Sequence, residues 1–234
     1  MTKRFLEVSD LHGWYGESHV LHGVDFHVDE GEVVTLLGRN GAGRTSTLRA
    51  IMGLIGSRKG SIKVKDTETA HLATHRIARL GIGYCPEERG IFSSLSAEEN
   101  LMLPPTLGPG GMGVEQIYAM FPNLKERAAS QGTRLSGGEQ QMLAVARILR
   151  TGARLLLLDE ISEGLAPVIV EKLGEVVKQL REQGYTIVMV EQNFRFAAEL
   201  ADRFLVMEHG QVIQEFPRAE LPARMERLHE YLGV

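Results

Sequence analysis

The chain has 234 residues, a formal net charge of −4 and one cysteine, Cys85. This length can bury the core of one large α/β domain, and the weakly acidic balance gives no basic surface for a nucleic acid partner. The single cysteine excludes an internal disulfide framework, and no apolar run approaches the roughly 20 residues of a membrane span, so we expect a cytosolic chain that works at a membrane only through a partner.

The first part of the chain predicts short strands around one strand–loop–helix unit. Each expected strand is an alternating or apolar run bounded by turn residues, at residues 4–8, 20–28, 33–37, 61–64 and 82–85. The run at 33–37 is rich in apolar and β-branched residues, which is typical of a buried strand. A helix is expected at 45–52, ended by Gly53.

The middle of the chain loses its strand patterns and becomes helical. Helices are expected at 96–102, 114–120 and 137–149, and the Pro- and Gly-rich segment 104–113 is expected to be a loop. We interpret residues 87–150, approximately, as a helical subdomain inserted into a sheet domain that spans residues 4–234.

The last part of the chain returns to an α/β pattern. Residues 154–158 and 186–190 are continuous apolar runs, and residues 168–183 between them have helical period, which together predict a βαβ unit of a parallel sheet. A hairpin is expected around His209-Gly210, and a final helix at 222–232.

A glycine-rich loop lies between the strand at 33–37 and the helix at 45–52. It follows the spacing GxxxxGK[ST] with one substitution, because Arg44 occupies the lysine position, and its residues are Gly38, Arg39, Asn40, Gly41, Ala42, Gly43, Arg44, Thr45 and Ser46. Glycines let backbone N–H groups approach phosphate oxygens, and the following helix start adds free N–H groups and a partial positive charge. The Thr45 hydroxyl is placed to bind Mg²⁺, so the loop predicts a nucleotide site.

Two carboxylates follow the apolar run 155–158. A buried strand that ends in acidic residues places them at the edge where open α/β sheets bind ligands. We expect Asp159 to hold Mg²⁺ and Glu160 to polarise an attacking water as a general base.

The segment Leu135–Gln140 is a second helix start that suits an anion. Ser136 is a predicted N-cap, Glu139 completes a capping box, and Gly137 and Gly138 leave N–H groups open. An ordinary capped helix fits this local sequence equally well.

Together these motifs resemble the ATP-binding subunits of ABC transporters, and the resemblance covers essentially the whole chain. Leu135–Gln140 matches the signature of that family, with Glu139 before the glutamine. The resemblance implies a P-loop NTPase sheet domain of the ABC type, with ATP and Mg²⁺ as cofactors. It also implies a head-to-tail dimer with a second ATP-binding subunit, in which Ser136 and Gly138, with Gly137 and Glu139 beside them, face the γ-phosphate held by the partner's loop.

The family also implies further partners and a location. They are transmembrane permease subunits and, indirectly, a periplasmic or extracellular binding protein, so the chain is expected on the cytoplasmic face of the membrane as a peripheral subunit.

Other family positions can be assigned by resemblance. Tyr15 corresponds to the aromatic residue that stacks on adenine, with Trp14 and a core role for Tyr15 as the alternatives. Glu87 stands where most members have a Mg²⁺-sensing glutamine, and Gln192 where most have a γ-phosphate-sensing histidine. The segment Glu163–Pro167 corresponds to the loop that contacts the other subunit.

Several departures from the common pattern resemble one subgroup, the shorter ATP-binding subunit of branched-chain amino acid importers. They are Pro86-Glu87, Glu191-Gln192-Asn193, Gly164–Pro167 and the segment 91–101. Urea and short-chain amide importers have closely similar subunits, and the subgroup favours a heteromeric over a homomeric dimer. A soluble ABC ATPase acting on DNA or the ribosome, and a non-hydrolytic nucleotide-binding regulator, are the competing classes.

Two substitutions are not explained by the subgroup. Ile161 replaces the proline that usually follows the catalytic glutamate, and Arg44 replaces the loop lysine. A guanidinium keeps the charge but is larger and planar, so two hypotheses follow. Either Arg44 folds over the phosphates and hydrolysis is slow, which we favour, or the site binds nucleotide and a companion subunit carries most of the catalysis.

Overall fold

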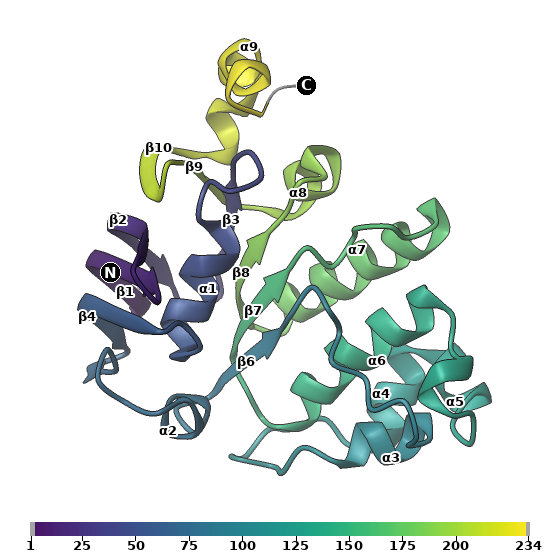
Figure 1. Ribbon diagram of the computed structural model, residues 1–234. Coiled ribbons are helices and arrows are strands. Elements are labelled where there is room, and N and C mark those ends of the chain that lie inside the picture. The colour runs from purple at the N-terminus through teal and green to yellow at the C-terminus, as the bar shows by residue number, and fades with distance from the viewer. Residues whose placement is uncertain (1–2, 233–234) are drawn as a thin grey trace.

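Two β-sheets lie on either side of helix α1 (Arg44–Met52) in the computed structural model, which describes residues 3–232 (Figure 1). The first sheet is antiparallel, with strand order β2-β1-β4-β5, and contains β1 (Arg4–Tyr15), β2 (Ser18–Asp29), β4 (Ser57–Val64) and β5 (Thr67–Glu68). The second has the order β10-β9-β3-β8-β7-β6 and contains β3 (Val33–Leu37), β6 (Ile82–Cys85), β7 (Leu155–Asp159), β8 (Thr186–Val190), β9 (Arg203–Glu208) and β10 (Gln211–Pro217).

The helices follow the chain as α2 (Thr74–Ala78), α3 (Ala97–Met102), α4 (Val114–Met120), α5 (Pro122–Glu126), α6 (Gly137–Arg150), α7 (Pro167–Glu182), α8 (Phe194–Leu200) and α9 (Leu221–Leu232). Short 3₁₀ turns occupy Gly132–Arg134 and Arg218–Glu220. Among the described residues, none of these helices is both long and apolar enough to cross a membrane.

The second sheet separates two hydrophobic cores, which its strand β7 illustrates. Successive side chains of a strand point to opposite faces, so Leu155 and Leu157 pack with α1 and the antiparallel sheet. Leu156 and Leu158 pack on the other face, against α6, α7 and the helices around them. Because β3, β7 and β8 are covered on both faces, all their residues are buried, which explains their predominantly apolar sequences.

Strands β3, β8, β7 and β6 are parallel neighbours in that order. Their carboxyl ends therefore meet at one edge of the sheet, where the chain leaves each strand into a loop. The loops after β3, β7, β6 and β8 begin with Gly38, Glu160, Pro86 and Glu191, respectively. This parallel pairing brings together segments from residues 38 to 191.

The strand and helix predictions for the long, strongly patterned segments are confirmed. The buried strands at 33–37, 82–85 and 186–190 and the helix at 114–120 have the predicted bounds. The βαβ unit is present as β7–α7–β8 with parallel pairing, and the hairpin as antiparallel β9–β10. Segment 104–113 contains no helix or strand.

Strand β1 is longer than predicted, because it continues past residue 8 to Tyr15. Register shifts after Val8 and a positive φ of 48° at Asp10 break the alternation on which the prediction relied. The short helices α2, α5 and α8 were not predicted.

The segment between β6 and β7 contains α3, α4, α5 and α6, with only an isolated bridge between Ser96 and Gln131. Its assignment as an inserted subdomain at about 87–150 stays a prediction. The predicted end of the domain at residue 234 lies outside the described residues.

We expect Leu157→Ala to lower the free energy of unfolding by about 2–5 kcal/mol, because Leu157 is fully buried in the central strand and truncation leaves a cavity. Denaturant unfolding followed by circular dichroism measures the change. Val168→Ala is the control, since Val168 is 66% exposed on α7 and its truncation should change stability by less than about 0.5 kcal/mol. Equal effects of the two substitutions would contradict this account of the core.

Candidate nucleotide site

The loop Gly38–Ser46 leads from the end of β3 into the first turn of α1, and close contacts require glycine at Gly38 and Gly43. A Cβ on Gly38 would lie 2.4 Å from the carbonyl oxygen of Met207. Gly43 has a φ of 101°, and a Cβ there would lie 3.1 Å from the Cα of Gly210. The loop is therefore held against the β9–β10 turn in a conformation that side chains would prevent.

The loop forms one wall of a cavity of about 370 Å³. The cavity brings together three sequence motifs that are far apart in the chain, because they follow neighbouring parallel strands. Its lining residues are Val20, Asn40, Gly41, Ala42, Gly43, Arg44, Thr45, Ser46, Glu87, Glu160 and Glu163. The structure thus places most of the predicted phosphate-loop residues beside Glu160 and Glu87, whereas Gly38 and Arg39 precede the cavity wall.

Arg44 is buried and contacts three protein acceptors. Its Nη2 donates to Glu160 Oε1 at 2.9 Å and to Asn40 Oδ1 at 3.2 Å. Its Nη1 donates to the carbonyl oxygen of Glu191 at 2.9 Å. Since β8 lies between β3 and β7, the guanidinium spans the ends of all three strands.

Asp159 is buried at the end of β7 and accepts two hydrogen bonds. The Thr45 hydroxyl donates to its Oδ1 and the Tyr84 hydroxyl to its Oδ2, both at 2.9 Å. Burial raises the pKa of Asp159, and these two hydrogen bonds oppose the shift. Thr45 and Asp159, the two predicted Mg²⁺ ligands on these elements, are in direct contact.

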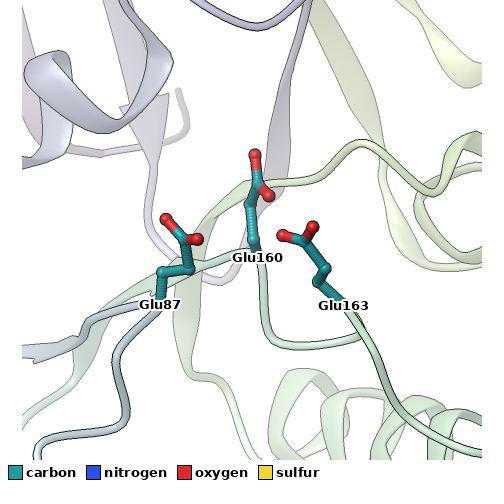
Figure 2. Close-up of side chains that lie close together, drawn as sticks. All are labelled: Glu87, Glu160 and Glu163. Carbon is teal, nitrogen blue, oxygen red and sulfur yellow. The ribbon is translucent and has the colours of Figure 1, made fainter.

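Three carboxyl groups line the same cavity as the loop. Glu87, Glu160 and Glu163 each offer an oxygen, and these oxygens lie within 4.8 Å of one another (Figure 2). Burial is the main cause that raises the pKa of Glu160, the neighbouring Glu163 carboxyl adds to the shift, and Arg44 opposes it. Burial also raises the pKa of Glu87, with contributions from Glu163 and Asp159.

Glu160 has a positive φ of 47°, a conformation that costs free energy for a residue with a side chain. Its backbone N–H donates to the carbonyl oxygen of Val190 at 2.8 Å, which fixes the turn after β7 against the end of β8. The strained turn directs the Glu160 carboxyl toward the phosphate loop.

The first two residues after β8, Glu191 and Gln192, differ in burial. Glu191 is buried, accepts from the Ser162 hydroxyl at 2.7 Å, and has its pKa raised to about 7 by burial. Gln192 is exposed and lines a neighbouring depression with Glu163 and Gly164, outside the cavity of the phosphate loop. The structure does not bring Gln192 into contact with the predicted phosphate-binding residues.

Tyr15 lies at the end of β1 and is 37% exposed, so the alternative that it is a core residue is wrong. Trp14, the other candidate for stacking on adenine, is already stacked on His19, with ring centroids 4.3 Å apart and planes 10° apart. Arg49 of α1 donates to Glu88 Oε1 at 2.8 Å, and the neighbouring Tyr84 is the main cause that raises the pKa of Arg49. Of the two candidates, Tyr15 is thus the one whose ring is not already stacked on a neighbouring aromatic ring in the described residues.

The signature segment begins α6 as predicted. Glu139 N–H donates to Ser136 Oγ at 3.3 Å and Ser136 N–H donates to Glu139 Oε2 at 2.7 Å, which is a complete capping box. Gly138 is buried, and a Cβ there would lie 2.9 Å from the Ile169 side chain of α7. Ser136, Gly137, Gly138 and Glu139 are not among the residues that line the phosphate-loop cavity of the same chain.

Sequence reasoning missed Tyr84, Arg49 and Glu163 as parts of this site. Tyr84 belongs to a short strand whose pairing with β7 is not encoded in its own four residues. Arg49 is one helical turn after Thr45, so helical spacing was the signal that places them on one face. Glu163 was predicted only as part of the loop that contacts the other subunit. Its carboxyl group lies near that of Glu160 because the chain turns after β7.

Comparison with known proteins agrees with this geometry. Residues 21–163 match the family described as ABC transporter. The chain is 39% identical to the high-affinity branched-chain amino acid transport ATP-binding protein BraG of Pseudomonas aeruginosa, over 94% of this chain and 96% of that protein. It is 31% identical to the lipopolysaccharide export system ATP-binding protein LptB of Escherichia coli, over 97% of each.

Solved structures give the same result. An ATP-binding subunit of an ABC transporter superposes with a TM-score of 0.80 at 27% identity, over 98% of this chain and 100% of that one. The dimeric ABC transporter cassette MJ0796 superposes with a TM-score of 0.81 at 25% identity, over 91% and 98%. The chain belongs to the ABC transporter family, as an ATP-binding subunit that hydrolyses ATP in a transport system.

We expect Tyr84→Phe to raise the Mg²⁺ concentration for half-maximal ATP hydrolysis about tenfold, because Asp159 loses the hydroxyl that orients it. A Mg²⁺ titration of phosphate release at saturating ATP measures this. Tyr185→Phe is the control, since Tyr185 is a buried tyrosine just before β8, at the opposite edge of the sheet. An unchanged Mg²⁺ dependence in Tyr84→Phe would show that the hydrogen bond does not position Asp159.

Proposed function

We propose that this chain is the ATP-binding subunit of an importer for branched-chain amino acids. The observation that carries the substrate class is the 39% identity to the Pseudomonas aeruginosa branched-chain amino acid transport protein over nearly the whole of both chains. A branched-chain amino acid transport ATP-binding protein of Archaeoglobus fulgidus is also 32% identical, over 89% of this chain. A lipopolysaccharide export protein at 31% identity indicates that the cassette fold serves other substrates as well.

In the proposed reaction, the backbone of the phosphate loop and Arg44 bind the phosphates of ATP. Glu160 accepts the proton of a water whose oxygen bonds to the γ-phosphorus, while the bond from that phosphorus to the bridging oxygen breaks and ADP leaves. The proximity of Glu160 to Arg44, at 2.9 Å, supports this role because it places the general base beside the phosphate loop. Tyr15 supplies the stacking face for adenine.

The residues present suit Mg²⁺. Thr45 offers a hydroxyl, and Asp159 and Glu87 offer carboxylates, which are the hard oxygen donors that this cation prefers. When bound, Mg²⁺ would neutralise charge on the phosphates. Tyr84 holds Asp159 in the orientation that such a ligand needs.

We propose that the complete site forms between two ATP-binding subunits arranged head to tail. Ser136 is exposed at a helix start with open N–H groups, yet it is absent from the lining of its own chain's cavity, which supports a role toward a partner's phosphates. Gln192 and the loop Glu163–Pro167 would face the same interface. The second subunit is either a copy of this chain or a different ATP-binding subunit, and we favour the different subunit.

The remaining partners follow from the same proposal. Transmembrane permease subunits would bind this chain at the cytoplasmic face of the membrane, and a binding protein outside would deliver the solute. A nucleic acid partner is not proposed.

Uptake in a strain that lacks its own branched-chain importers tests the substrate class. We expect radiolabelled leucine to accumulate about tenfold above background when this chain is expressed with the second ATP-binding subunit, the permease subunits and the binding protein of its system. Glu160→Gln is the control, because it should assemble equally well and transport nothing. Accumulation of urea or a short-chain amide in place of leucine would transfer the proposal to that importer class.

We expect Mg²⁺-dependent hydrolysis by the unmodified chain, and an increase of about tenfold in Arg44→Lys, equivalent to about 1.4 kcal/mol of activation free energy. Lysine is a compact point charge that fits between phosphates, whereas the guanidinium is larger and held by protein acceptors. Phosphate release at saturating MgATP measures the rate, with Glu160→Gln as the blank. No gain in Arg44→Lys would mean that the loop has adapted fully to arginine.

A further inference from the structure

Three hydrogen bonds hold the guanidinium of Arg44 next to Glu160. Its two terminal nitrogens serve three acceptors, which are Asn40 Oδ1 on its own loop, Glu160 Oε1 after β7 and the carbonyl oxygen of Glu191 after β8. A lysine ammonium is a single nitrogen, so it cannot occupy both positions of the guanidinium fork. This arrangement is therefore particular to arginine at residue 44.

The pair of Arg44 and Glu160 is shielded from water. The Arg44 side chain is 4% exposed and the Glu160 side chain 10% exposed, with 2.9 Å between Nη2 and Oε1. Charged groups in such surroundings interact more strongly than at the surface, and removal of one partner leaves the other buried without its counter-charge. A group that draws Arg44 away must therefore supply negative charge of its own.

Glu160 also lies close to two further carboxyl groups. The carboxyl oxygens of Glu87, Glu160 and Glu163 converge within 4.8 Å (Figure 2). The left-handed backbone of Glu160 fixes its direction. A general base needs a free carboxylate oxygen within hydrogen-bond reach of its water, and the hydrogen bond from Arg44 occupies Oε1 of Glu160.

We propose that Arg44 is a positioning residue that holds Glu160, and that the phosphates of ATP compete with Glu160 for the same guanidinium. When phosphate oxygens take Arg44, Glu160 is released toward the water that it must polarise. Nucleotide binding and release of the general base are thereby one event in this chain. This inference rests on the proposed function, because it needs ATP in the phosphate loop.

A consequence is that the Glu160 carboxylate lowers the affinity for ATP, because it competes with the phosphates for Arg44. Glu160→Gln keeps an oxygen that accepts from Arg44 but removes the negative charge, so the competitor is weakened. A charge-assisted hydrogen bond is about twice as strong as a neutral one, so its loss should be visible in nucleotide affinity. The effect should require arginine at residue 44.

The experiment is a double-substitution cycle on the full chain, with Arg44→Lys, Glu160→Gln and the combination of both. Isothermal titration with Mg²⁺ and a non-hydrolysable ATP analogue gives Kd for each protein. We expect Glu160→Gln to lower Kd about tenfold in the chain with Arg44, and less than about twofold in the Arg44→Lys background. Arg181→Lys is the matched control, because it alters an arginine–carboxylate pair, with Asp202, that lies away from the loop.

The outcomes separate the two claims. An equal decrease in Kd in both backgrounds would mean that Glu160 acts only as a general negative charge, and it would overturn this inference while leaving the proposed function intact. A lower Tm in the single variants with no change in Kd would assign the pair a structural role and would overturn it as well. No analogue binding by any of the four proteins would overturn the proposed function itself.

Discussion

The parallel pairing of β3, β8, β7 and β6 is the constraint on which the rest of the structure depends. It brings the phosphate loop, the carboxylates after β7, Glu87 and the segment after β8 to a single edge of the sheet. Parallel strands need crossover connections, and here these are α7 and the helices between β6 and β7. Burial of both faces of the sheet fixes the strand order and, with it, the distances in the site.

The electrostatics of the site follow from that edge. Four acidic side chains, Glu87, Asp159, Glu160 and Glu163, converge there, and burial raises the pKa of the first three. Arg44 is the cation that contacts this group directly, at Glu160. The substitution of lysine by arginine is thus more than a change in the loop, since the fork of the guanidinium links the loop to two other strand ends.

The chain nevertheless retains the parts that its family needs. Thr45 and Asp159 are in contact, Tyr84 hydrogen-bonds to Asp159, and Ser136 caps a helix whose first residues do not line its own chain's cavity. Ile161, which replaces the usual proline, is buried in the core beneath the turn, and nothing in the structure assigns it a further role. The two substitutions, at Arg44 and Ile161, therefore leave the fold of the ABC cassette unchanged.

The buried strands, the βαβ unit, the capped start of α6 and the glycine loop follow from the sequence alone, because periodicity and capping are local properties of the chain. Residue types at fixed spacing also singled out Thr45, Asp159 and Glu160 as candidates. The contacts of Arg44 with Glu160 and the Glu191 carbonyl, the hydrogen bond from Tyr84 to Asp159 and the position of Gln192 outside the cavity became visible in the tertiary structure. Those contacts depend on which strands are neighbours, and the order β3-β8-β7-β6 is set by packing across the whole sheet rather than by any short segment.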